Sequence, residues 1–111
     1  MSSLYHVWFR TQTGAPVLEG VLAEDTRHLL LDAARDANVR VLEAEPSFHE
    51  AHLLLSISDD HDLASIVAQL TSAAARAGVL WRDAYGYRTI AAAELPTLRR
   101  YFNQLRPPLY R

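Results

Sequence analysis

Apolar residues recur along this chain at two spacings, every second residue and every third or fourth residue. The first spacing, rich in β-branched and aromatic residues, is typical of strands, and the second predicts amphipathic helices. In chain order, the expected elements are a strand over 4–11, a helix over 22–37, strands over 39–45 and 49–58, a helix over 61–77, a strand over 79–91 and a helix over 93–105.

Residues that favour turns and caps divide these elements. Asn38 is a plausible stop for the first helix, and Gly78 is expected to end the second. Pro46-Ser47 predicts a short break between two strands that form a hairpin. Asp59-Asp60 is a capping signal for the second helix, and Gly86 suggests a bend or bulge in the last strand.

The order of the elements predicts an α+β fold. Strand, helix, strand, strand, helix, strand is the ferredoxin-like βαββαβ arrangement, an antiparallel sheet with two helices on one face. The C-terminal helix is surplus to that plan, so it either covers the other face of the sheet or reaches a partner subunit. The length of 111 residues favours a single domain over 1–111. Because many functions use this fold, function must be argued from a site.

Composition narrows the classes of function. The chain has no cysteine, which excludes disulfide frameworks, thiolate zinc sites and thiol nucleophiles. No apolar run approaches the ~20 residues of a membrane span, and the N-terminus lacks the features of a signal peptide, so we expect a cytoplasmic protein without a membrane partner. The formal net charge of −2 argues mildly against broad nucleic-acid binding, but it allows a local basic face.

The strand over 49–58 carries the most informative polar residues. Alternation along a strand puts Glu50 and His52 on one face, ~7 Å apart, while His49 faces away. Long side chains at that separation can converge on one ion, and a carboxylate with an imidazole suits Mg²⁺ or Mn²⁺. The alternative is that both residues are solvated on an open sheet face. The opposite face of the strand suits the core, with Ala51, Leu53, Leu55 and Ile57.

Five segments in this order resemble the small tyrosine transposases of the insertion-sequence and REP-associated type, in the HUH single-strand endonuclease superfamily. The resemblance covers nearly the whole chain and rests on YHVWFRT, AHLLLSI, LASIVAQL, LWRDAYGYRTI and LRRYFNQL. It implies DNA transposition on single-stranded DNA, often beside a hairpin. It also implies a homodimer, and a tyrosine nucleophile that becomes joined to a 5′ phosphate with the help of a divalent metal ion.

Residue by residue, the resemblance implies that Tyr101 is the nucleophile and His52 the second histidine of the metal motif. Glu50 stands where the first histidine is expected. The family places a glutamine ligand four residues after the tyrosine, whereas Gln104 follows by three, which is also about one helical turn. The metal set implied is therefore Glu50, His52 and Gln104, with Mg²⁺ or Mn²⁺.

Other residues have two interpretations each. Arg99, Arg100 and Arg106 could contact DNA phosphates, or they could complement the C-terminal dipole of a helix. Tyr101 could be a packing residue, because it lies at helical spacing from other apolar residues. His6 could approach the site or be a structural histidine. Three functions stay open: a metal-dependent nicking transposase, a relative that binds DNA without cutting it, and an unrelated ferredoxin-like dimeric binding module.

Overall fold

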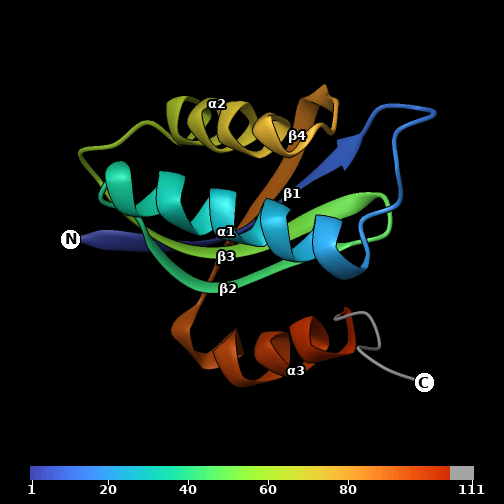
Figure 1. Cartoon of the computed structure of the whole chain (residues 1–111). Coiled ribbons are helices and arrows are strands. Elements are labelled where there is room, and N and C mark those ends of the chain that lie inside the picture. The colour runs from blue at the N-terminus through green and yellow to red at the C-terminus, as the bar shows by residue number, and fades with distance from the viewer. Residues whose placement is uncertain (106–111) are drawn as a thin grey trace.

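Four antiparallel strands form one sheet in the computed structural model, which describes residues 1–105 (Figure 1). The strands are β1 (Ser2–Thr11), β2 (Arg40–Ser47), β3 (Glu50–Ser58) and β4 (Trp81–Ile90), in the spatial order β2-β3-β1-β4. The helices are α1 (Gly20–Asp36), α2 (Leu63–Ala74) and α3 (Leu95–Leu105), with short 3₁₀ turns at Ala75–Ala77 and Ala92–Glu94. This order and these pairings confirm the predicted ferredoxin-like α+β fold.

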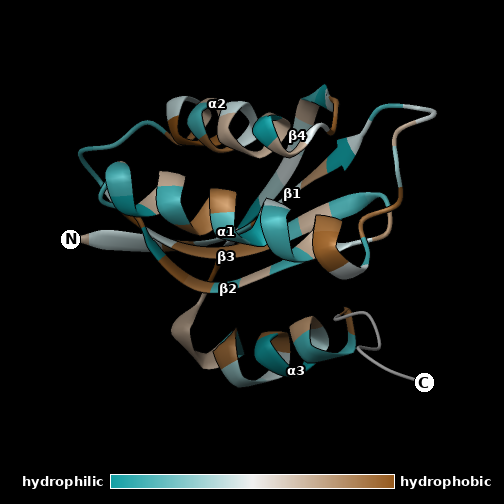
Figure 2. Ribbon diagram, in the orientation of Figure 1, coloured by the Kyte–Doolittle hydropathy of each residue, from teal (hydrophilic) through white to brown (hydrophobic). Residues whose placement is uncertain are grey.

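One face of the sheet packs against α1 and α2. The predicted inward residues of β3 all lie in this core and are at most 2% exposed: Ala51, Leu53, Leu55 and Ile57. Leu30 of α1 and Leu70 of α2 meet them and are fully buried. Figure 2 shows brown, apolar segments along both helices, and the buried ones among them pack in this core. The period-two and helical spacings in the sequence therefore identified this core correctly.

The C-terminal helix α3 covers the opposite face of its own sheet (Figure 1). A second apolar cluster forms there from Leu54, Ile90, Leu98 and Phe102, of which Leu54 and Phe102 are fully buried. This finding decides between the two positions that the sequence left open for the surplus helix. Polar residues of β3 that face this side lie beneath a helix.

The carboxylate of Glu94 stabilises the turn that leads the chain from β4 into α3. The Glu94 carboxylate accepts a hydrogen bond from the Ala91 backbone N–H at 3.2 Å and contacts Arg88 at 3.1 Å. The Ala91 hydrogen bond and the Arg88 guanidinium hold the pKa of Glu94 below its usual value. Both contacts favour the sharp turn that returns the chain beneath the sheet.

The helix ends agree with the sequence except at one cap. Asn38 and Gly78 follow α1 and the 3₁₀ turn after α2 with left-handed φ values of 58° and 91°, as expected of helix stops. The prediction that Asp59-Asp60 caps the second helix was wrong. Asp62 is the cap, because its carboxylate accepts from the backbone N–H of Ser65 at 3.2 Å.

Two predictions about the sheet also need correction. Pro46-Ser47 does not interrupt the strand, since both residues belong to β2 and pair with β3. Gly86 itself is not bulged, because it pairs in regular register with Trp8, whose indole occupies the place where a Cβ would stand. The missing side chain at Gly86 therefore makes room for Trp8. A bulge does occur in the same strand, because Phe9 and Thr11 of β1 pair with Tyr85 and Trp81, which places Arg82 to Ala84 of β4 opposite Arg10 alone.

No helix within residues 1–105 is both long and apolar enough to cross a bilayer.

Candidate functional site

Two histidines meet on the face of the sheet that α3 covers. His6 of β1 and His52 of β3 lie on neighbouring strands, and Nε2 of His6 is 3.0 Å from Nδ1 of His52. The other ring nitrogen of His52, Nε2, is 3.3 Å from Oε1 of Glu50. Oε2 of Glu50 is in turn 3.5 Å from Nε of Arg10. The polar chain His6–His52–Glu50–Arg10 thus runs from beneath the helix to the surface.

The two histidines of this polar chain are buried, whereas its two outer residues are partly exposed. His6 and His52 are 8% and 7% exposed, so the interpretation of His52 as a solvated residue was wrong. Glu50 and Arg10 are partly exposed. Burial, followed by the charges of His52 and Arg88, lowers the pKa of His6 from 6.5 to about 4. His6 is therefore a neutral imidazole at pH 7.

Sequence reasoning missed one acidic neighbour and left a second residue undecided. Glu45 of β2 stands directly across from His52 in the strand register and is 3% exposed. His6 was expected either to approach the site or to serve the structure, and its contact with His52 settles that it approaches. The pairing of β2 with β3 shifts between Val41 and Glu43, and a sequence pattern carries no signal for such a shift.

Aromatic rings cover the histidines. The Tyr101 ring of α3 lies with its centroid 6.1 Å from that of His52 and 6.3 Å from that of His6. Phe102 is fully buried against His6 at 5.3 Å, whereas Tyr101 is 41% exposed. Helix packing is thus carried by Phe102 and Leu98, while Tyr101 stands over the histidines with access to solvent.

The remaining predicted site residues are spread over α3. Gln104 is exposed, and its role as a metal ligand stays a prediction. Arg99 is held by β2, where Nε is 3.1 Å from a Glu43 carboxylate oxygen and Nη2 donates to the Leu42 carbonyl at 3.4 Å. Arg100 is exposed and donates to the Thr97 hydroxyl at 3.4 Å. Arg106 lies outside the described residues.

The donor set around Glu50 and His52 is incomplete for a metal ion. Oε1 of Glu50 and Nε2 of His52 are close enough for both to contact one small cation, and their chemistry suits Mg²⁺ or Mn²⁺. Over residues 1–105, no group of three or more histidine or acidic side chains is arranged to hold an ion. Further donors would have to be an amide, water or the oxygens of a bound phosphate.

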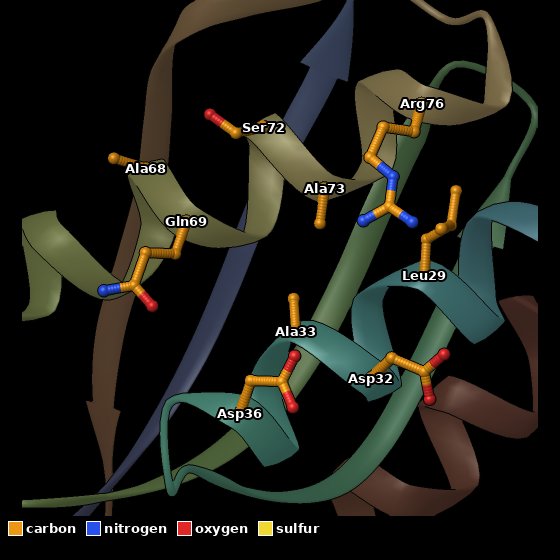
Figure 3. A pocket seen from close by; sticks show the side chains of 9 residues that line it. All are labelled: Leu29, Asp32, Ala33, Asp36, Ala68, Gln69, Ser72, Ala73 and Arg76. Carbon is orange, nitrogen blue, oxygen red and sulfur yellow. The ribbon is translucent and has the colours of Figure 1, made fainter.

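A groove of about 520 Å³ lies elsewhere, between α1 and α2 (Figure 3). Small side chains such as Ala33 and Ala73 form much of its lining, and Asp32, Asp36 and Arg76 stand around it. None of the described residues that line this groove is a predicted site residue. The chemistry-bearing cluster and the groove are thus on opposite faces of the sheet.

Comparison with known proteins gives one family and a common fold. The family described as "Transposase IS200 like" matches residues 1–104. A candidate transposase from Deinococcus radiodurans R1 has a similar structure, with a TM-score of 0.75 and 21% identity over 97% of this chain and 94% of that one. A REP-associated tyrosine transposase bound to a REP hairpin is also similar, with a TM-score of 0.66 and 14% identity over 93% of this chain and 64% of that one. Among curated proteins there is no match.

Proposed function

Because the chain belongs to the IS200-like transposase family, we propose that it binds single-stranded DNA beside a hairpin and cleaves one strand with Tyr101 as the nucleophile. One observation carries the proposal: the partly exposed Tyr101 ring stands 6.1 Å from the His52 ring, on the face where Glu50 and His52 meet. Tyr101 is 41% exposed, whereas its neighbour Phe102 is fully buried and packs the helix onto the sheet.

The reaction would proceed by transesterification. The phenolic oxygen of Tyr101 gives up its proton and forms a bond to phosphorus, while the bond from phosphorus to the 3′ oxygen breaks. The products are a 5′-phosphotyrosine and a free 3′ hydroxyl. Tyrosine is a weak nucleophile at its ordinary pKa of ~10, so it needs activation and an in-line position.

A divalent ion is the activating group that the proposal includes. Glu50 and His52 would hold Mg²⁺ or Mn²⁺, with Gln104 as the third protein ligand of the hypothesis. When bound, such an ion polarises the scissile phosphate and stabilises the leaving oxygen.

His6 prepares His52 for this role. For His52 to present a lone pair at Nε2, its proton must sit on Nδ1, and Nδ1–H then donates to Nε2 of His6. The lowered pKa of His6, about 4, keeps its ring neutral at pH 7 and leaves Nε2 able to accept. A buried hydrogen bond of this kind fixes both the tautomer and the ring orientation of His52.

A second candidate function is DNA binding without cleavage. It is favoured by the contacts of the Glu50 carboxylate, in which one oxygen faces His52 at 3.3 Å and the other faces Arg10 at 3.5 Å. In that arrangement, the carboxylate and the imidazole satisfy one another and need no ion. The loss of the first motif histidine agrees with this candidate, as does the net charge of −2.

DNA is the partner in both candidates. The similar structure of a REP-associated transposase contains a bound REP hairpin, which supports hairpin DNA as the partner here. Arg99, Arg100 and Arg106 are the proposed phosphate contacts, of which Arg99 would first have to leave Glu43. A homodimer also remains part of the proposal.

Adduct formation tests the proposal. Labelled hairpins with randomised single-stranded flanks are incubated with the protein and Mn²⁺, and denaturing gels are read for a covalent protein–DNA band. We expect a band that is lost in Tyr101→Phe and strongly reduced in His52→Ala. The matched control is Tyr87→Phe, since Tyr87 is an exposed tyrosine that packs on Tyr5, on the face covered by α1 and α2.

The outcomes separate the candidates. Salt-sensitive binding with no covalent band under any divalent metal would refute cleavage and leave the second candidate. Absence of any DNA binding would refute both.

A further inference from the structure

The hairpin between β2 and β3 has an unusual residue in its turn. Ser47 pairs with Glu50, which leaves Phe48 and His49 as a two-residue loop. Phe48 has a φ of 57°, and His49 does not have a positive φ. A positive φ at the first loop residue alone is the pattern of a type II′ turn, where glycine is strongly preferred. Phenylalanine is poorly suited to this conformation because its Cβ crowds the backbone.

Neighbouring backbone fixes this conformation. Phe48 and Leu18 exchange two hydrogen bonds, from Leu18 N to Phe48 O at 2.7 Å and from Phe48 N to Leu18 O at 3.1 Å. Thr11 N donates to His49 O at 2.9 Å. Leu18 is fully buried in the main core. The loop is therefore rigid, and the strain is held by the surrounding fold.

The Phe48 side chain does not compensate for this strain by burial. The other two phenylalanines, Phe9 and Phe102, are at most 1% exposed, whereas Phe48 is 52% exposed. Asn38, the other non-glycine residue with positive φ within residues 1–105, is of a type that tolerates the conformation. Neither backbone preference nor core packing thus accounts for a phenylalanine in this turn.

The position of the loop points to a role in binding. Phe48 lies two residues before Glu50, at the outer end of the polar chain. Arg10 is paired with Glu50 in the strand register, and its side chain is 56% exposed. Proteins bind single-stranded nucleic acid with exposed aromatic rings that stack on bases and with cations that meet phosphates, and this end of the hairpin offers one exposed residue of each kind, Phe48 and Arg10.

We propose that Phe48 is a stacking platform for an unpaired base of the DNA strand that enters the Glu50–His52 site. This inference rests on the proposed DNA-binding function and adds to it a contact with a base. Because the loop is already rigid, little conformational entropy is lost when the base stacks.

Two substitutions distinguish a role of the Phe48 ring in DNA binding from a role in folding. Phe48→Asn removes the ring and places a residue that tolerates positive φ, so the urea midpoint should stay equal to that of the wild type or rise. Phe48→Tyr keeps both the ring and the strain. Fluorescence anisotropy measures the Kd of each for labelled hairpins with randomised single-stranded flanks, in the presence of Mg²⁺, and for the same hairpins without flanks.

We expect Phe48→Asn to weaken binding of flanked hairpins by about 5- to 100-fold, and Phe48→Tyr to bind within about twofold of the wild type. Blunt hairpins should show no such difference, because they offer no unpaired base beside the stem. Tyr87→Leu, which removes an exposed ring on the other face of the sheet, is the matched control and should bind normally.

If the wild type binds flanked hairpins and Phe48→Asn binds them equally well, this inference is overturned while the proposed DNA-binding function stands. The inference also fails if Phe48→Asn lowers the urea midpoint, since Phe48 would then be a structural residue. If the wild type binds neither kind of DNA, the proposed function and this inference are both overturned.

Discussion

Mild acid should destabilise this fold through His6. The pKa of His6 is about 4 in the folded protein, against 6.5 as the usual value, because burial and the charges of His52 and Arg88 oppose its protonation. Above pH 6.5, His6 is neutral in both the folded and the unfolded chain, so it contributes no pH dependence. Between pH 6.5 and about 4, only the unfolded chain binds the proton, and stability is lost as the pH falls.

The size of this loss follows from the same values. The difference between 6.5 and about 4, at about 1.4 kcal/mol per pH unit, corresponds to about 3 kcal/mol once the pH reaches the folded pKa. That is a large part of the total stability of an ordinary domain, about 5–15 kcal/mol. Acidic side chains also titrate near the lower end of the window, so the contribution of His6 must be isolated by a variant.

The assay is urea unfolding, followed by circular dichroism at a series of pH values from 7 to 4. His6→Gln keeps an amide beside Nδ1 of His52 but cannot titrate, so its free energy of unfolding should fall less steeply than that of the wild type. His28→Gln, at an exposed histidine of α1, should follow the wild type. Equal pH slopes for the wild type and His6→Gln would refute the reasoning.

Three further predictions concern packing and capping. Gly86→Ala should cost about 1–3 kcal/mol, because the new Cβ would overlap the Trp8 indole; an unchanged melting temperature would contradict this role. Leu54→Ala should cost about 2–5 kcal/mol in urea unfolding, since Leu54 is fully buried beneath α3, and a cost well under 1 kcal/mol would mean that α3 does not stay on the sheet. Asp62→Ala should lower the free energy of unfolding by about 1 kcal/mol through the lost cap, while Asp60→Ala should change it by less than about 0.5 kcal/mol. A larger loss for Asp60→Ala than for Asp62→Ala would support the cap predicted from the sequence.

Periodic features of the fold were readable from the sequence. The alternation along β3 identified both of its faces, because each side chain on a strand points opposite to its neighbour. It predicted correctly that Ala51 and Leu53 belong to the main core, and that Glu50 and His52 share the other face. The order of the elements was sufficient to predict the ferredoxin-like sheet.

Features that depend on neighbouring chain segments were not readable in this way. The position of α3 follows from the contact of Leu98 and Phe102 with Leu54, which no local pattern encodes. The position of Glu45 opposite His52 depends on a shift in strand register. Asp62 rather than Asp59-Asp60 caps α2, and the sequence could not distinguish them because neighbouring acidic residues offer equivalent local signals.

The positions of some candidate site residues were readable from the sequence, while their catalytic and metal roles stay predictions. The resemblance singled out His52 and Tyr101, and the fold brings their rings together. It did not identify His6, whose hydrogen bond with His52 links two strands that are far apart in the sequence. The metal role of Gln104 stays a prediction, and Arg106 lies outside the described residues.

Anomalous diffraction from crystals soaked in Mn²⁺ tests the central claim most directly, because it requires no knowledge of the DNA sequence. The account predicts a peak between Oε1 of Glu50 and Nε2 of His52, with Tyr101 above it and Arg10 displaced from the carboxylate. The same soak of His52→Ala crystals should give no peak. A wild-type site without a peak, with Glu50 still paired to His52 and Arg10, would contradict metal-assisted cleavage and leave a transposase-family protein that binds DNA without cutting it.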